Sequence, residues 1–184
     1  MERHGKPTAT TPGSGSSRKN PRPRPAARVI LIDHQQRVLL FRAELTGPRW
    51  GEVENPIFWG TPGGGLNPSE SWEEAAQREI WEEIGLKNCD IGPCAWLREH
   101  TFFFPPDGLW YNQQERYFVS HIASHEVVTQ HQEQFEAEFM TEHRWWTLAE
   151  MRATSERLVP GNFAALFEAL LANGPPAEPF EVGL

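Results

Sequence analysis

The chain has 184 residues, of which 39% are hydrophobic and 11% aromatic, so it can bury one substantial core but hardly two. The formal net charge is −8, and six of the seventeen basic residues lie within residues 1–25, which leaves residues 26–184 with 11 basic and 24 acidic residues. An acidic body of this kind repels nucleic-acid phosphates unless a local basic patch or bound cations reverse the field, so we do not expect polymeric nucleic acid as a partner.

The two cysteines, Cys89 and Cys94, provide neither a zinc-binding set nor a disulfide framework. The N-terminus lacks the apolar stretch of a signal peptide, and no apolar run is long enough to span a bilayer. We therefore expect a soluble, cytoplasmic protein that does not enter a membrane.

Residues 1–25 differ in composition from the rest of the chain, because they are rich in Pro, Gly, Ser and Thr and almost empty of large apolar side chains. Such a segment cannot offset its ordering entropy by burial, so we expect a flexible basic tail. One globular domain is expected over residues 26–174, followed by a short C-terminal tail over residues 175–184.

The first predicted elements are two apolar strands, residues 28–33 and 37–42, whose short polar connection indicates a hairpin. A loop punctuated by Gly and Pro follows over residues 44–57. It leads to a short apolar stretch, residues 58–59, and then to a glycine-rich turn, residues 60–65.

A helix is predicted over residues 72–84. Ser71 and Glu74 fit the capping box, in which the serine hydroxyl accepts from a first-turn amide and the glutamate returns to the cap. Gly85 can adopt the left-handed conformation that ends a helix.

Beyond this helix the chain alternates short apolar segments with turns. The predicted strands span residues 95–97, 101–104, 116–122 and 144–146, a turn falls at 105–108, and helical segments span residues 148–151 and 162–172. Mixed strands with few helices favour an α/β or α+β fold in which helices cover a mixed sheet.

The predicted helix carries three carboxylates on one face. Glu79, Glu82 and Glu83 fall within an arc of about 100°. Like charges three or four residues apart destabilise a helix by about 0.2–0.5 kcal/mol per pair, so the crowding indicates a compensating cation, and carboxylate oxygens favour Mg²⁺ or Mn²⁺. The alternative is an ordinary solvated face on which Arg78 only pairs with Glu74.

The residues around this helix follow a longer pattern. From Gly64 to Leu86 the chain reads GGLNPSESWEEAAQREIWEEIGL, which resembles the Nudix box without a gap. The segments at residues 59–65 and 144–146 also resemble parts of the Nudix family, and the likeness extends over residues 27–172. The resemblance implies an α/β/α sandwich around a mixed β-sheet, with the box as a loop-helix-loop unit.

The resemblance also implies roles for the box residues. Glu79, Glu82 and Glu83 map onto the metal-binding carboxylates of a pyrophosphohydrolase that uses Mg²⁺ or Mn²⁺. Arg78 would orient them by ion pairing, and Glu70 would either contribute to the metal site or brace the loop.

Further site residues follow from the same resemblance. The backbone of Gly63, Gly64 and Gly65 would turn tightly and approach the ligand, since glycine has no Cβ. A general base would come from the helix or from a later loop, where Glu138 and Glu142 are the candidates and an exposed loop acid is the alternative for each.

The implied substrate is a nucleoside diphosphate linked to another group, whose diphosphate bond is cleaved by water attack on phosphorus. A nucleobase would stack on an aromatic side chain, although burial in the core is the alternative role for each of the candidates Trp59, Phe102, Phe104 and Trp110. Dimers are common in the family, and this single domain permits a homodimer.

Two other functions belong to the same fold. A nucleotide-sensing domain without turnover is the main alternative, although a sensor would be free to lose the carboxylates, all of which are present here. An isomerase acting on isopentenyl diphosphate would need a catalytic thiol, which the positions of Cys89 and Cys94 do not clearly supply.

Overall fold

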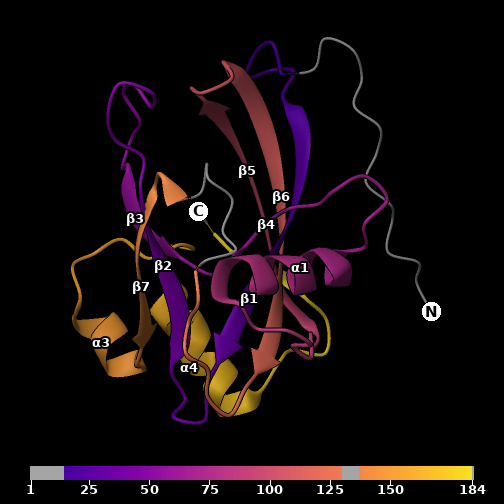
Figure 1. Ribbon diagram of the computed structural model, residues 1–184, viewed down its shortest axis with the longest axis vertical. Coiled ribbons are helices and arrows are strands. Elements are labelled where there is room, and N and C mark those ends of the chain that lie inside the picture. The colour runs from indigo at the N-terminus through magenta and orange to yellow at the C-terminus, as the bar shows by residue number, and fades with distance from the viewer. Residues whose placement is uncertain (1–14, 130–136, 184) are drawn as a thin grey trace.

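A mixed β-sheet forms the centre of the molecule in the computed structural model, which describes residues 15–129 and 137–183 (Figure 1). The elements in chain order are β1 (Arg22–Ile32), β2 (Val38–Glu44), β3 (Ile57–Gly60), β4 (Gly63–Gly65), α1 (Trp72–Ile84), β5 (Cys94–Phe104), β6 (Leu109–His121), β7 (Met140–Trp146), α3 (Leu148–Ala153), α4 (Phe163–Asn173) and β8 (Phe180–Glu181). Within the described residues, no helix has the length and apolarity needed to cross a membrane.

The sheet combines parallel and antiparallel pairs. Its main strand order is β3-β2-β1-β6-β5-β8, while β4 also pairs with β1 and β7 also pairs with β2. The longest parallel pair joins β1 to β6, in register from Arg22 opposite Tyr111 to Ile32 opposite His121. Strands β1 and β2 form the predicted antiparallel hairpin.

Helices cover both faces of the sheet, which confirms the expected α/β/α sandwich (Figure 1). Because side chains alternate along a strand, β1 sends Val29 and Leu31 into a core beneath α1 and sends Ile30 and Ile32 into a core beneath α4. Helix α1 packs on the first core through small and apolar residues such as Ala76, whereas α4 contributes mainly aromatic and leucine side chains to the second core.

Helix α1 has the predicted bounds, Trp72–Ile84. Both halves of the capping box form between Ser71 and Glu74, and Gly85 ends the helix with φ of 73°. These local interactions place the helix start and end at defined residues, so the register of the carboxylates on α1 follows directly from the sequence.

The ordered domain begins earlier than expected. Strand β1 starts at Arg22, inside the segment predicted to be a tail; residues 1–14 of that segment lie outside the described residues. The carbonyl of Pro25 accepts from Leu66 N, so the backbone polar groups of Pro25 face away from β6 and its ring removes no hydrogen bond from the β1–β6 ladder. Proline content alone therefore gave a wrong boundary.

Two other boundaries differ from expectation. The predicted strands at residues 95–97 and 101–104 form one continuous strand, β5, because its ladder with β6 runs through the intervening polar residues. The predicted C-terminal tail contains β8, which pairs with β5 and leads to the buried side chain of Val182.

Candidate active site

A cavity of about 800 Å³ is lined by residues of β1, β5 and β6 and of the loop that leads into α1. These three strands extend beyond the helices (Figure 1). One part of the cavity lining comes from the predicted box, namely Gly63, Gly64, Gly65, Arg78, Glu79, Glu82 and Glu83. Another part comes from arginine and aromatic side chains of the three strands. The three predicted metal-binding carboxylates therefore share one cavity.

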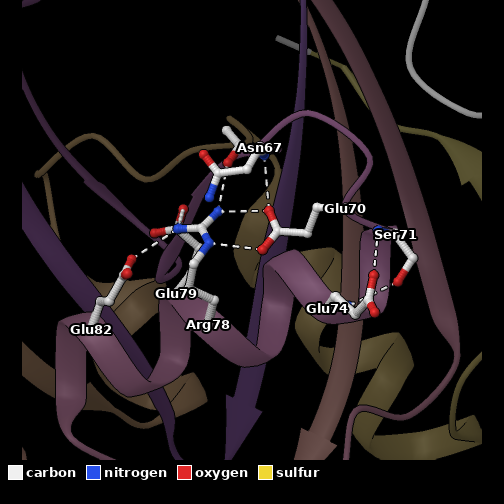
Figure 2. A network of polar contacts seen from close by, with 8 residues as sticks. Asn67, Glu70, Ser71, Glu74, Arg78, Glu79 and Glu82 are labelled. Atoms are coloured by element: carbon white, nitrogen blue, oxygen red, sulfur yellow. Dashed lines mark hydrogen bonds and ion pairs between the residues drawn. The ribbon is translucent and has the colours of Figure 1, made fainter.

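Arg78 is the centre of the polar network on α1 (Figure 2). Its guanidinium donates to both oxygens of Glu70, at 2.9 and 3.0 Å, and to the carbonyl of Gly65 at 2.8 Å. It also donates to Glu79 at 2.7 Å and to Glu82 at 2.8 Å. Arg78 thus bridges Glu70, Glu79 and Glu82, and these contacts raise the pKa of Arg78, mainly through the hydrogen bonds to Glu70.

Glu70 does not line the cavity but holds the loop before α1. It accepts from Arg78 and from Asn67 N, at 2.9 Å in the latter case, and the bonds from Arg78 keep the pKa of Glu70 below its ordinary value. Of the two roles predicted for Glu70, its contacts support bracing of the loop.

The loop and the helix are joined through Gly63 and Glu83. The carboxylate of Glu83, which is 1% exposed, accepts from Gly63 N at 2.8 Å. Gly63 has φ of 127°, and a Cβ at this position would lie 2.1 Å from the carbonyl oxygen of Ala27. Only glycine fits at this position, and it brings the loop backbone into contact with a carboxylate of α1.

Gly64 lies against a side chain rather than against backbone. A Cβ on Gly64 would lie 2.6 Å from Oε1 of Glu79, so the missing side chain leaves room for that carboxylate. A Cβ on Gly65 would approach no atom closer than the 3.7 Å to Nη2 of Arg24, so space alone does not demand glycine there. Close contacts with the backbone of Ala27 and with the carboxylate of Glu79 thus explain the absence of a side chain at Gly63 and at Gly64.

The donor set fits a hard divalent cation. Glu79 and Glu83 are almost fully buried beside the cavity, where uncompensated carboxylates are costly, and Glu82 lines the same cavity. Among the described residues, no three Asp, Glu, His or Cys side chains converge on one metal position. In this arrangement Arg78 contacts Glu79 and Glu82, so its guanidinium supplies the positive charge that these carboxylates require.

The part of the cavity lining that comes from β1, β5 and β6 carries residues that the sequence interpretation missed. Arg28 donates to Glu115 at 2.9 Å and also to the carbonyl of Gly63, while Arg98 donates to the second oxygen of Glu115 at 2.6 Å. Gln113 and Tyr117 complete the contacts of Glu115, at 2.7 and 3.0 Å. A buried carboxylate thus holds two guanidinium groups on the cavity wall.

The electrostatics of this wall follow from burial and charge. Burial by itself raises the pKa of Glu115, but the charges of Arg28 and Arg98 outweigh it and lower the pKa to about 2. Burial, followed by the charge of Arg98, lowers the pKa of His100 to about 4. The carboxylate is therefore charged and the imidazole neutral near pH 7.

A sequence signal for this wall does exist. Polar side chains occur at alternate positions along parts of β1, β5 and β6, which places them on one face of each strand. The positions are Arg22, Arg24 and Arg28 on β1, Arg98 and His100 on β5, and Gln113 and Glu115 on β6. The alternation was hidden because residues 22–25 were assigned to the tail.

The loop candidates for the general base are not brought to this cavity. Glu138 pairs with Arg49, and both side chains are about half exposed. Glu142 lies on β7 and lines a separate pocket of about 130 Å³. Residues 130–136 lie outside the described residues.

The aromatic candidates divide into two groups. Phe102 and Phe104 line the cavity, where Phe104 meets Trp50 edge to face at 5.5 Å between ring centroids. Trp59 is buried against Trp146 in the core beneath α4, and Trp110 does not line the cavity. Phe102 and Phe104 therefore remain as surfaces for an aromatic ligand, and Trp50, which the sequence interpretation did not name, lines the same cavity.

A family model described as NUDIX domain matches residues 22–167, and the chain belongs to the Nudix family. An RNA pyrophosphohydrolase of Caulobacter vibrioides (strain NA1000 / CB15N) is 27% identical over 163 residues, which cover 83% of this chain and 86% of that protein. Another RNA pyrophosphohydrolase, of Proteus mirabilis (strain HI4320), is 31% identical over 111 residues, 56% of this chain; the chain thus spans little more than half of that relative, 57%.

Solved structures show the same fold. The MutT protein from Methanosarcina mazei Go1 superposes with a TM-score of 0.55 at 20% identity, covering 82% of this chain and 94% of that chain. A mutT/nudix family protein from Listeria innocua gives a TM-score of 0.53 at 20% identity, covering 81% and 92%. At such identities the likeness concerns the fold.

Proposed function

We propose that this protein hydrolyses the diphosphate bond of a nucleoside diphosphate linked to another moiety, using Mg²⁺ or Mn²⁺ and water that attacks phosphorus. The observation that carries the proposal is that Glu79, Glu82 and Glu83 all line one cavity beside the glycine loop. Membership of the Nudix family and the pyrophosphohydrolase names of the relatives agree with it.

The chain's own residues prepare this chemistry. Arg78 holds Glu79 and Glu82 toward one another, and Gly63 N fixes the carboxylate of Glu83. Glu79, Glu82 and Glu83 would hold the divalent cation. A bound divalent cation neutralises the charge of phosphate oxygens and lowers the pKa of coordinated water. Both effects favour the attack of water on a phosphoanhydride.

The general base is best sought on α1. Glu138 and Glu142 lie outside the cavity lining, whereas the carboxylates of α1 lie within it. A carboxylate of α1 that faces the cavity can accept a proton from water during attack. We therefore assign this role to one member of the α1 set, Glu79, Glu82 or Glu83.

The substrate panel follows from the cavity and the relatives. It includes ADP-ribose, NADH, dinucleoside polyphosphates, nucleotide sugars and oxidised nucleoside triphosphates. The relatives are named RNA pyrophosphohydrolases, so an RNA with a 5′ triphosphate belongs in the panel as well. Turnover in ¹⁸O-labelled water identifies the phosphorus that is attacked, because the label appears in the product that contains this phosphorus.

Variants of α1 provide the decisive test. Glu82→Gln and Glu83→Gln should each lower kcat by about 100-fold or more, since a charged group that stabilises the transition state is lost. The fold should persist, because a glutamine oxygen at position 83 can still accept from Gly63 N. Glu73→Gln is the matched control, because Glu73 is an exposed acid of the same helix that does not line the cavity.

The outcomes separate enzyme from sensor. Hydrolysis that requires Mg²⁺ or Mn²⁺ and is lost in both active-site variants but not in the control supports the proposal. Full activity in Glu82→Gln and Glu83→Gln would remove these residues from the mechanism. Binding across the panel without turnover would favour a nucleotide-sensing domain. An isomerase is disfavoured because neither cysteine of the chain lines the cavity.

A further inference from the structure

The connection between β2 and β3 is a loop whose two ends lie side by side. Residues 45–56 form this connection, and the N–H of Leu45 donates to the carbonyl of Pro56 at 2.8 Å. Among residues 46–55, Trp50 is buried and Val53 is half-buried, while the others are exposed. A loop of this length with its ends held together is an Ω-loop, and here one large side chain, Trp50, is buried at its tip.

Trp50 attaches the tip of this loop to two other parts of the chain. Its ring meets Phe104, at the end of β5, and Phe139, just before β7, each edge to face at 5.5 Å between ring centroids. The β2–β3 connection and the β5–β6 hairpin project from the same end of the molecule (Figure 1). The indole ring, which is 6% exposed, therefore joins these two projections.

The polar contacts of the loop are exposed to solvent. Arg49 pairs with Glu138, and these two side chains are 50% and 48% exposed. The carbonyl of Asn55 accepts from Arg157 at 3.2 Å in an exposed hydrogen bond. Exposed ion pairs contribute little to stability, whereas a buried aromatic ring contributes much, so burial of Trp50 is the larger of these attachments.

Glycines flank Trp50 on both sides. Gly47 has φ of 93° and Gly51 has φ of 60°, and a Cβ at either position would meet no atom within 4 Å. The N–H of Trp50 donates to the carbonyl of Gly47 at 3.1 Å, so a turn presents the indole ring. Glycines in open space can change their backbone angles without a clash, as hinge residues must.

The loop also forms part of the cavity. Trp50, Val53 and Asn55 line it together with the carboxylates of α1. A segment with few buried contacts opens locally at a lower free energy than the core of the same protein, and segments of this kind commonly cover binding sites. The burial pattern of the loop, its glycines and its position at the cavity therefore point to the same role.

We propose that residues 46–55 form a lid on the cavity, which closes when Trp50 packs against Phe104 and Phe139 and opens about Gly47 and Gly51 to admit and release ligand. The observation that carries this inference is that Trp50, at the tip of an exposed loop, is buried against segments from elsewhere in the chain. The lid does not rest on the proposed hydrolysis, because a domain that only binds a ligand would use it in the same way.

Hydrogen exchange of the full chain tests whether the loop is held by Trp50. In Trp50→Ala the amides of residues 46–55 should exchange about tenfold faster or more, while those of β1 and β6 keep their wild-type rates. Trp50→Leu should change the rates in the same direction by a smaller factor, and it replaces Trp50→Ala if that variant does not fold. Glu52→Gln is the matched control, because Glu52 is an exposed acid of the same loop that does not line the cavity.

Access to the cavity is measured with a cysteine placed inside it. Ala43 on β2 lines the cavity and is 7% exposed, so Ala43→Cys reports how often the cavity opens to a maleimide reagent. The reaction is followed on the peptide that contains residue 43, so that Cys89 and Cys94 do not contribute. Adding Trp50→Ala to Ala43→Cys should speed the reaction about tenfold or more, and adding Glu52→Gln should leave the rate unchanged.

The two measurements together decide the matter. Faster exchange in residues 46–55 and faster modification at residue 43 support the lid. Faster modification without faster exchange would overturn it, because Trp50 would then only fill space. Faster exchange without faster modification would also overturn it, because the loop would then move without controlling access. Unchanged rates, or equal acceleration in β1 and β6, would overturn it as well. Neither measurement needs a substrate, so failure of the lid and failure of the proposed function are distinguishable.

Discussion

Arg78 offers the sharpest test of how the α1 carboxylates are held together. Its guanidinium makes five contacts of 2.7 to 3.0 Å, with three carboxylates and one carbonyl. A lysine ammonium has three donors and no planar fork, so Arg78→Lys must lose at least two of these contacts. At about 1.5–3 kcal/mol for each hydrogen bond to a charged group, and with partial exposure of the network, we expect a loss of about 2–4 kcal/mol in the free energy of unfolding.

The measurement is urea denaturation at low ionic strength without divalent cations. Arg152→Lys serves as the control, because Arg152 pairs with Glu168 on the surface and the two side chains are 55% and 50% exposed. That variant should lose less than about 1 kcal/mol. Equal losses in the two variants would refute the idea that Arg78 holds the network.

Divalent cations extend the test. If Arg78 supplies charge that a cation can also supply, then Mg²⁺ or Mn²⁺ should stabilise Arg78→Lys more than the wild type, by mass action on the native state. The deficit of about 2–4 kcal/mol should shrink accordingly. An unchanged deficit at saturating Mn²⁺ would show that Arg78 does not substitute for the cation.

Two further predictions concern the glycine loop and the response to pH. Gly64→Ala should fold with a loss below about 1 kcal/mol, since only the end of the Glu79 side chain must move, yet lose activity by about 100-fold through that displacement. Gly63→Ala should lose about 2 kcal/mol or more, because its Cβ meets backbone at φ of 127°; similar urea curves for both variants would contradict this. As the pH is lowered from 6.5 to 4, the free energy of unfolding should decrease. The reason is that unfolded His100 binds a proton in this range, whereas folded His100, with a pKa of about 4, does not. Below about pH 4.5 the lowered pKa of Glu115 should continue the fall toward pH 2, and urea midpoints of His100→Asn across this range should lack the first decline.

The contribution of the sequence to the candidate site is greatest on α1. Ser71 and Glu74 cap the N-terminus of α1, and Gly85 ends the helix. Because these interactions are local, the bounds of α1 could be predicted to the residue. The spacing of Glu79, Glu82 and Glu83 then placed all three acids on one face, and the structure brings them to one cavity. Capping and helical periodicity are local, and local rules can be read from a sequence.

The strands were less predictable because their neighbours are distant. The parallel pairing of β1 with β6 keeps residues 22–25 in the sheet although their composition resembles a tail. A strand is stabilised by partners on either side of it, and these partners come from elsewhere in the chain. Composition alone therefore placed the domain boundary too late.

The cluster of Arg28, Arg98 and Glu115 in the cavity lining depended entirely on tertiary structure. Arg28 and Glu115 are separated by 87 residues, and Arg98 and Glu115 by 17, yet all three meet through the registers of β1, β5 and β6. The sequence by itself determined the helix, its carboxylates and the turn before it, because each depends on short-range backbone geometry. Only the pairing of the strands decided which charges face those carboxylates, because burial and hydrogen bonding between distant segments select the register.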